Sequence, residues 1–196
     1  GQCHGSGASG AKGYPNLNDD DWLWGGDLAT LEKTIADGIR QPNHDATRFS
    51  QMPAFGRDGI LQPAQIEDTT SYVRALSHQE AMSASARRGQ ALFAANCAVC
   101  HGADGTGMRA QGAPNLTDAI WLYSGDRATI GQTITNSRYG VMPAWNLHLD
   151  KVKIRMLAAY VYSLGGGEAA PAPAPDQAVD AAAAAESPAE AGNVGG

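Results

Sequence analysis

Residues 97–101 read Cys-Ala-Val-Cys-His, a C-x-x-C-H motif at the end of an apolar helical segment. Thiols three positions apart lie on the same side of a helical turn. This spacing is the signature of c-type haem attachment, in which two sulfurs bond the porphyrin and the histidine becomes the proximal iron ligand. The sequence therefore predicts a haem held by Cys97 and Cys100, with His101 bound to its iron.

Two other chemistries use a C-x-x-C pair. A zinc site would need two more soft ligands nearby, and the second half of the chain offers only His101 and the distant His148. A redox-active dithiol is typical of a strand–helix–strand unit, and no strand-like alternation stands out. Both alternatives predict a colourless protein, and both are weaker than haem.

The chain begins Gly-Gln-Cys3-His4, which matches the second half of the same motif. Aligning the two motifs places a missing first cysteine directly before Gly1, so the chain is interpreted as a fragment cut within a first attachment motif. The chain has three cysteines, and an odd number does not suit a disulfide framework. We expect a second c-type haem at Cys3 and His4, held in this chain by a single thioether.

The chain also repeats itself. Matching stretches are YPNLNDDDWLWGGDLAT (14–30) with APNLTDAIWLYSGDRAT (113–129), SQMPAFG (50–56) with GVMPAWN (140–146), and SYVRALS (71–77) with AYVYSLG (159–165). So long a period indicates two tandem domains of one fold rather than a solenoid. The predicted division is a first domain at 1–78, a linker at 79–84, a second domain at 85–165 and a tail at 166–196.

Helical periodicity dominates both copies. Apolar residues recur at helical spacing after Asp150 and after Asp27, positions where an aspartate can cap a helix. The fold class is therefore predicted as all-α. Each domain of about 80 residues has a thin core of its own, so the haem-free chain is expected to lose most of its helical structure.

Methionines are the candidates for the sixth iron ligand. Only Met52 and Met142 recur at matching positions, each in a Met-Pro-Ala-aromatic sequence. A thioether is a soft ligand that raises the reduction potential of haem iron. The sequence predicts the ligand pairs His4 with Met52 and His101 with Met142. The remaining methionines are placed in a helix, in the linker or too close to the motif: Met156, Met82 and Met108.

Two further features concern the surroundings of the haem. Pro15 and Pro114 each open a repeated Pro-Asn-Leu, and their carbonyls are expected to accept a hydrogen bond from the proximal imidazole. Arg57, Arg127 and Arg138 are candidate partners of the haem propionates, and the sequence does not choose among them.

Charge and composition limit the kinds of partner that the chain can have. The net charge is −6, but five acidic residues lie in the tail, which has no Lys or Arg. No basic stripe interleaved with aromatics is present, so nucleic acid is not an expected partner. No apolar run approaches the ~20 residues that span a bilayer. The tail is rich in Ala, Pro, Glu and Gly, a composition typical of disorder.

Several of these stretches carry a family resemblance. CAVCHG, APNLTDAIWLYSGD, VMPAW and LAAYVYSLG resemble the second haem domain of the dihaem subunit III of cbb3-type cytochrome c oxidases, and YPNLNDDDWLWGG, QMPAFGRDGIL and SYVRALS resemble its first. The similarity covers about residues 1–165. It implies class I cytochrome c domains, in which Gly89 and Phe93 of a first helix would pack against Tyr160 of a last helix.

The resemblance also implies a function. Members of the family relay electrons at the periplasmic face of the bacterial inner membrane, from the bc1 complex or a soluble cytochrome c toward the oxygen-reducing catalytic subunit, beside a monohaem cytochrome subunit. N-terminal membrane helices anchor them, and this sequence lacks such an anchor. With both irons saturated by ligands, no catalytic residue is expected.

Two other functions stay open at this stage. The first is a soluble periplasmic dihaem shuttle, or the cytochrome subunit of a periplasmic dehydrogenase. The second is a dihaem peroxidase, which would need an iron with an open coordination position.

Overall fold

Helices form where the apolar spacing predicts them. The computed structural model describes residues 2–171, and no strand is found among them; only isolated bridges occur. The all-α prediction is confirmed. The α-helices are α1 (Leu28–Asp37), α2 (Pro63–Leu76), α3 (Ala84–Asn96), α4 (Ala98–His101), α5 (Arg127–Asn136) and α6 (Lys151–Ser163), with short 3-10 turns at Ser6–Ala8, Arg109–Gln111 and Trp145–Leu147.

Side-chain caps fix where these helices begin. Asp27, Ser83, Asp126 and Asp150 each precede a helix and accept a hydrogen bond from a backbone N–H of its first turn. Such caps satisfy donors that the helix leaves unpaired. α2 instead begins with Pro63, whose missing N–H costs nothing in a first turn.

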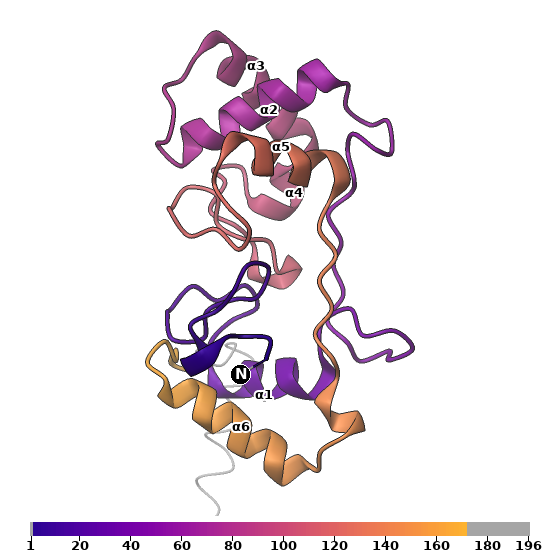
Figure 1. The fold of residues 1–196 in the computed structure, drawn as a ribbon, viewed down its shortest axis with the longest axis vertical. Helices are drawn as coiled ribbons and strands as arrows, with labels where there is room; N and C mark the ends of the chain where they lie inside the picture. Colours follow the sequence, from indigo (N-terminus) through magenta and orange to yellow (C-terminus); the bar gives the residue numbers. More distant parts are fainter. Residues whose placement is uncertain (1, 172–196) are drawn as a thin grey trace, which may run out of the picture.

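The helices form two lobes, one above the other in Figure 1. In the first, which we call the α2–α5 lobe (52–136), α2 packs on α3 and on α5. In the second, the α1–α6 lobe (2–38 and 142–171), α1 packs on α6. The connecting segments 39–51 and 137–141 run alongside each other between the lobes.

The two lobes do not coincide with the two sequence repeats. α2 belongs to the first repeat but packs on α3 of the second, and α6 of the second repeat packs on α1 of the first. The helices are therefore not paired as the division into 1–78 and 85–165 predicts. In chain order, the α2–α5 lobe is one continuous stretch inserted between the two parts of the α1–α6 lobe.

The crossing of the connecting segments explains this exchange. The backbone N–H of Ile39 donates to Met142 O at 2.9 Å, and the N–H of Met142 donates to Ile39 O at 3.0 Å. Gly38 and Ser137, each the residue after a helix, have φ of 67° and 66°. This left-handed backbone turns each segment away from its own repeat and toward the other lobe.

The exchange also replaces a predicted aromatic contact. Gly89 lets α3 approach α2 closely, since a Cβ there would lie 2.0 Å from Asp68 O. The ring of Phe93 meets that of Tyr72, with centroids 5.3 Å apart at an angle of 63°. The prediction that Gly89 and Phe93 pack against Tyr160 is therefore wrong. Tyr72 occupies the equivalent repeat position on α2, and Tyr160 is 58 % exposed on α6.

Each lobe is stabilised by one cluster of buried apolar residues. The cluster of the α2–α5 lobe is the larger and consists of Phe55, Leu61, Ile66, Tyr72, Val73, Ala86, Phe93, Cys97, Ile130 and Ile134. That of the α1–α6 lobe contains only Leu31, Ile35, Ile154 and Ala158 as buried members. Burying one large aliphatic or aromatic side chain contributes about 1.5–3 kcal/mol, so the first lobe has much the stronger core.

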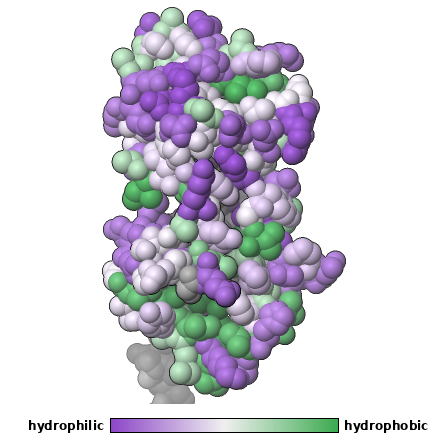
Figure 2. Space-filling view, viewed as in Figure 1, coloured by the Kyte–Doolittle hydropathy of each residue, from purple (hydrophilic) through white to green (hydrophobic). Residues whose placement is uncertain are grey.

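The outer face of α6 is apolar and exposed. Val152, Met156, Leu157, Tyr160 and Tyr162 are all exposed on this helix. Figure 2 shows hydrophobic residues gathered over the lower part of the molecule, where α6 lies, and a more hydrophilic surface above. Within the part of the chain that the structure describes, no helix packs on this face of α6.

The first residues of the predicted tail contact the α1–α6 lobe. The indole N–H of Trp22 donates to Gly166 O at 2.5 Å, and Glu168 accepts from the backbone N–H of Gly26 at 2.7 Å and pairs with Arg109. Disorder beginning at residue 166 is therefore not what is observed. The rest of the predicted tail, 172–196, lies outside the described residues. No helix among the described residues has the length and apolar character needed to span a membrane.

Candidate haem sites

A cavity of about 240 Å³ lies beside the C-x-x-C-H motif in the α2–α5 lobe. Its walls are mostly apolar, and side chains of several segments contribute to them. The chemically important side chains on the lining are Cys97, Cys100, His101 and Met52. Among the apolar residues that line it are Phe55, Val73, Phe93, Leu116, Trp121, Ile130 and Ile134.

The two cysteines reach the cavity from the corner between α3 and α4. Cys97 ends α3 and also precedes α4, whose single turn contains Cys100. Both thiols are free. Burial, and to a lesser extent Cys100, raises the pKa of Cys97 to about 11, so this sulfur is a protonated thiol at neutral pH. The corner therefore presents two sulfurs to one apolar space, as haem attachment requires.

His101 is oriented by a backbone carbonyl. Its Nδ1–H donates to Pro114 O at 3.1 Å, which leaves Nε2 free as a ligand. Burial lowers the pKa of His101, against the opposing effect of the Pro114 bond, so the neutral, ligating form is favoured. The hydrogen bonds Leu116 N–H to Gly105 O (2.7 Å) and Thr117 N–H to Asn115 Oδ1 (2.9 Å) hold the Pro-Asn-Leu segment in place.

The same arrangement recurs at the first motif. The Nδ1–H of His4 donates to Pro15 O at 2.9 Å, and the His4 ring lies edge-on to Tyr14 with centroids 6.3 Å apart. Cys3 is exposed. The predicted hydrogen bond from each histidine to its proline carbonyl is thus confirmed in both copies.

The two methionines lie in lobes other than those that the predicted pairing implies. Met52, predicted to pair with His4, lines the cavity of His101. Met142, predicted to pair with His101, does not line that cavity and packs instead on the core of the α1–α6 lobe. The cause is the crossing of segments 39–51 and 137–141, which carries each Met-Pro-Ala sequence into the lobe of the other repeat.

Two arginines line the cavity. Arg138 lies over the ring of Tyr123 at 4.4 Å, and Arg40 lies near Tyr139 at 5.6 Å. Of the three predicted propionate partners, the structure brings only Arg138 to the cavity. Arg40 was missed because the repeat aligns it with Tyr139, so no paired basic residue marks it.

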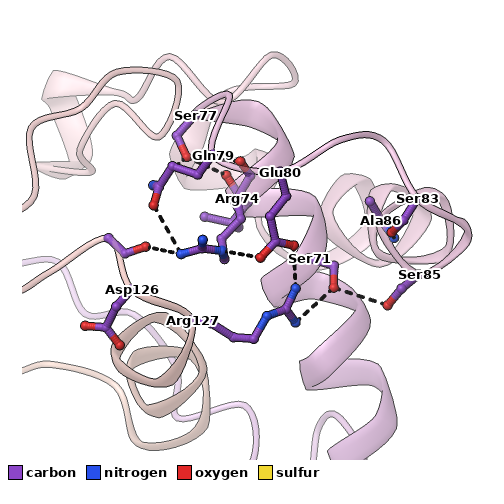
Figure 3. Close-up of polar contacts among 12 residues, drawn as sticks. Ser71, Arg74, Ser77, Gln79, Glu80, Ser83, Ser85, Ala86, Asp126 and Arg127 are labelled. Carbon is purple, nitrogen blue, oxygen red and sulfur yellow. Dashed lines mark hydrogen bonds and ion pairs between the residues drawn. The ribbon is translucent and has the colours of Figure 1, made fainter.

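The other two predicted arginines are engaged elsewhere. Arg127 forms ion pairs with Glu67 and Glu80, in a polar network that also joins Glu80 to Arg74 (Figure 3). Arg74 in turn donates to Gly125 O at 2.7 Å. This network fastens the linker to α2 and to the start of α5. Arg57 pairs with its neighbour Asp58 at the surface.

The donor set of the cavity suits a haem. Two thiols and an imidazole come from one corner, a thioether comes from a separate segment, the walls are apolar, and two guanidinium groups are available for carboxylates. Across residues 2–171 no three side chains of His, Cys, Asp or Glu cluster in a way that would hold a metal ion. The zinc alternative therefore gains no support.

Comparisons with known proteins agree with this chemistry. Residues 1–77 match the family model described as cytochrome c, and residues 84–161 match the model described as cytochrome c oxidase, cbb3-type, subunit III.

Curated relatives match over most of the chain. The chain is 56 % identical over 167 residues to the cbb3-type cytochrome c oxidase subunit CcoP of Cereibacter sphaeroides, which covers 85 % of this chain and 58 % of the relative. It is 54 % identical over 167 residues to subunit FixP of a Bradyrhizobium species, covering 85 % and 57 %. It is 50 % identical over 175 residues to subunit CcoP of Rhodobacter capsulatus, covering 85 % and 59 %. The chain thus spans somewhat more than half the length of these relatives.

Proposed function

The chain belongs to the CcoP and FixP family of cbb3-type cytochrome c oxidase subunits, and from this premise we propose that it relays single electrons through two c-type haems to the oxygen-reducing subunit of the oxidase. It is a cytochrome subunit with covalently bound haem c. The observation that supports the relay best is the apolar cavity on which two thiols, a neutral imidazole and a thioether meet.

Each residue of this cavity has a distinct task. Bound haem supplies an iron that alternates between Fe(III) and Fe(II). Cys97 and Cys100 hold the group covalently, and the bond to Pro114 fixes the orientation of the His101 imidazole. A methionine thioether favours Fe(II) and raises the potential, and apolar walls exclude water and so limit reorganisation. Because His101 and Met52 would both bind the iron, the chain would transfer electrons and offer no position to a substrate.

The partners and the location follow from the same proposal. The electron donor is a soluble cytochrome c or the bc1 complex, and the acceptors are the monohaem cytochrome and catalytic subunits of the oxidase. Covalent haem attachment takes place outside the cytoplasm, so we place both lobes at the periplasmic face of the bacterial inner membrane, with an anchor supplied by a longer form of the chain.

Two measurements test the relay. A pyridine haemochrome assay with protein quantitation counts the haems, and two per chain are expected. Stopped-flow mixing of the reduced chain with an oxidase preparation depleted of this subunit should then show reoxidation of both haems that depends on oxygen. Haems that stay reduced would contradict the proposal. Rapid turnover of peroxide would instead indicate the dihaem peroxidase.

A further inference from the structure

The two lobes meet through a pair of matching contacts. The sequence repeat aligns Gly13 with Gly112, and Trp24 with Tyr123. A Cβ at Gly13 would lie 3.2 Å from Cε1 of Tyr123. A Cβ at Gly112 would lie 2.2 Å from Cε2 of Trp24. Glycine allows a ring to approach the backbone this closely, so each lobe places one aromatic side chain against a glycine of the other lobe.

Each of these glycines lies close to the carbonyl that orients a proximal histidine. Pro15, two residues after Gly13, accepts the hydrogen bond from His4 at 2.9 Å. Pro114, two residues after Gly112, has the same role in the second repeat. The aromatic ring of one lobe therefore contacts the loop that holds the histidine of the other lobe.

A hydrogen bond accompanies the contact of Tyr123. The backbone N–H of Gly13 donates to Leu122 O at 2.8 Å, and both Leu122 and Tyr123 line the cavity of the second attachment motif. The bond from His4 to Pro15, the intervening backbone and this second bond form a continuous connection. It runs from the histidine of the first motif to the wall of the other haem site.

Arginines hold the two rings in matching ways. Arg138 lies over the ring of Tyr123 at 4.4 Å, and Arg48 lies over the ring of Trp24 at 5.4 Å. The Nε–H of each arginine donates to a threonine hydroxyl, at 3.0 Å on α5 and at 2.9 Å on α1. A guanidinium over an aromatic face is attracted to it. Each ring is thus held by its own lobe while it contacts a glycine of the other.

From this geometry, and resting on the proposed function, we propose that electrons pass between the two haem sites through this contact, with Tyr123 and Trp24 as its positioning residues. One electron leaves an Fe(II) and reaches an Fe(III); no bond forms or breaks, no proton moves, and neither ring is oxidised. Electron tunnelling is faster through bonded and closely packed atoms than across a gap. The route through Gly13 and Tyr123 includes a hydrogen bond, so it is the more important of the two.

The two haems can be followed separately in the chain as it stands. Cys3 offers one thioether, whereas Cys97 and Cys100 offer two. The first haem therefore keeps a free vinyl group, and its reduced α band lies at longer wavelength. A viologen radical generated by pulse radiolysis delivers single electrons to the oxidised chain. Absorbance at the two bands then reports how fast an electron redistributes between the haems, as a phase that does not depend on protein concentration.

The variants are Tyr123→Leu and Trp24→Leu, with Tyr160→Leu as a control at an exposed tyrosine. Tyr123→Leu should slow the redistribution severalfold, Trp24→Leu should slow it less, and the control should leave it unchanged. Tyr123→Phe keeps the ring and should restore the parent rate. Potentiometric titration of each variant gives the two haem potentials, so that rates are compared at a known driving force.

Four results would overturn the proposal: an unchanged rate in Tyr123→Leu, equal slowing in the Tyr160→Leu control, slowing that the change in potentials accounts for, or equal slowing in Tyr123→Phe. If Tyr123→Leu does not fold, an unchanged rate in Trp24→Leu overturns the proposal in its place. Fast exchange between the haems of a chain that passes no electrons to the oxidase would instead refute the proposed function alone.

Discussion

Helices α2 and α6 occupy equivalent positions in the two repeats, yet their surroundings differ sharply. Tyr72 of α2 is 5 % exposed beneath α3, and its counterpart Tyr160 of α6 is 58 % exposed. Asp68 of α2 is buried, while the counterpart Met156 is 67 % exposed. Burial here depends on whether a helix such as α3 packs alongside, and the side chain itself does not decide it.

The largest expected effect compares the two tyrosines. Tyr72→Ala removes a buried ring from the α2–α3 contact and should lower the free energy of unfolding by about 3–5 kcal/mol, as truncations of buried large aromatics do. Tyr160→Ala should change it by less than about 0.5 kcal/mol, as at other exposed positions. Urea unfolding of the holoprotein, followed by circular dichroism, measures both. Equal losses at the two positions would mean that α6 is covered as α2 is.

The next effect compares two glycines within helices. Gly89→Ala places a methyl group against the backbone of Asp68 and should destabilise the chain by about 1–3 kcal/mol through overpacking. Gly131→Ala on α5 meets nothing closer than Thr70 Oγ1 at 3.6 Å. It should stabilise the chain by up to about 1 kcal/mol, because alanine favours helix. Thermal unfolding of the two variants side by side tests the pair. No loss of stability in Gly89→Ala would contradict the close crossing of α2 and α3, and a large loss in Gly131→Ala would contradict the open space beside that glycine.

The smallest expected effect is a loss of folding stability at acidic pH. Hydrogen bonds from Arg88 and then Ser85 lower the pKa of Asp68. Burial raises the pKa of Glu80, but bonds from Arg74 and Arg127 outweigh it and the net pKa is lowered. Because both folded pKa values lie below the ordinary values of about 3.9–4.3, the stabilisation is complete above that range. It is lost as the pH falls through the range to the lowered values.

Unfolding free energies measured between neutral pH and pH 3 check this sign. Asp68→Asn should flatten the acid decline, because the variant has no carboxyl to protonate at that position. α6 has Met156 where α2 has Asp68, so the part of the decline that Asp68 causes belongs to the α2–α5 lobe. The pKa values of Asp27, Asp37 and Asp150 are also lowered, so these residues give the α1–α6 lobe an acid decline of its own, which Asp68→Asn leaves in place. A variant that declines as steeply as the parent would show that the Asp68 pair contributes nothing to it.

Much of this molecule was predictable from local sequence. The C-x-x-C-H motif, the aspartate caps and the bond from each histidine to its Pro-Asn-Leu carbonyl depend on residues near one another in the chain. Local sequence did not predict which helices pack against each other. Tyr72 and Tyr160 are interchangeable in the repeat, so Gly89 and Phe93 can accept either one. The choice is made by the backbone turns at Gly38 and Ser137, and Ser137 gives no warning of a positive φ.

The insertion of one lobe within the other has a consequence for biogenesis. During synthesis His4 emerges before His101, but the lobe of His4 cannot close until α6, the last helix among the described residues, has appeared. The α2–α5 lobe is complete once about residue 137 has been made. At that point the α1–α6 lobe still lacks α6. Proteolytic removal of α6 would therefore deprive the α1–α6 lobe of half its core and leave the α2–α5 lobe whole. The lobe whose first segment is made earlier is thus the lobe that closes later.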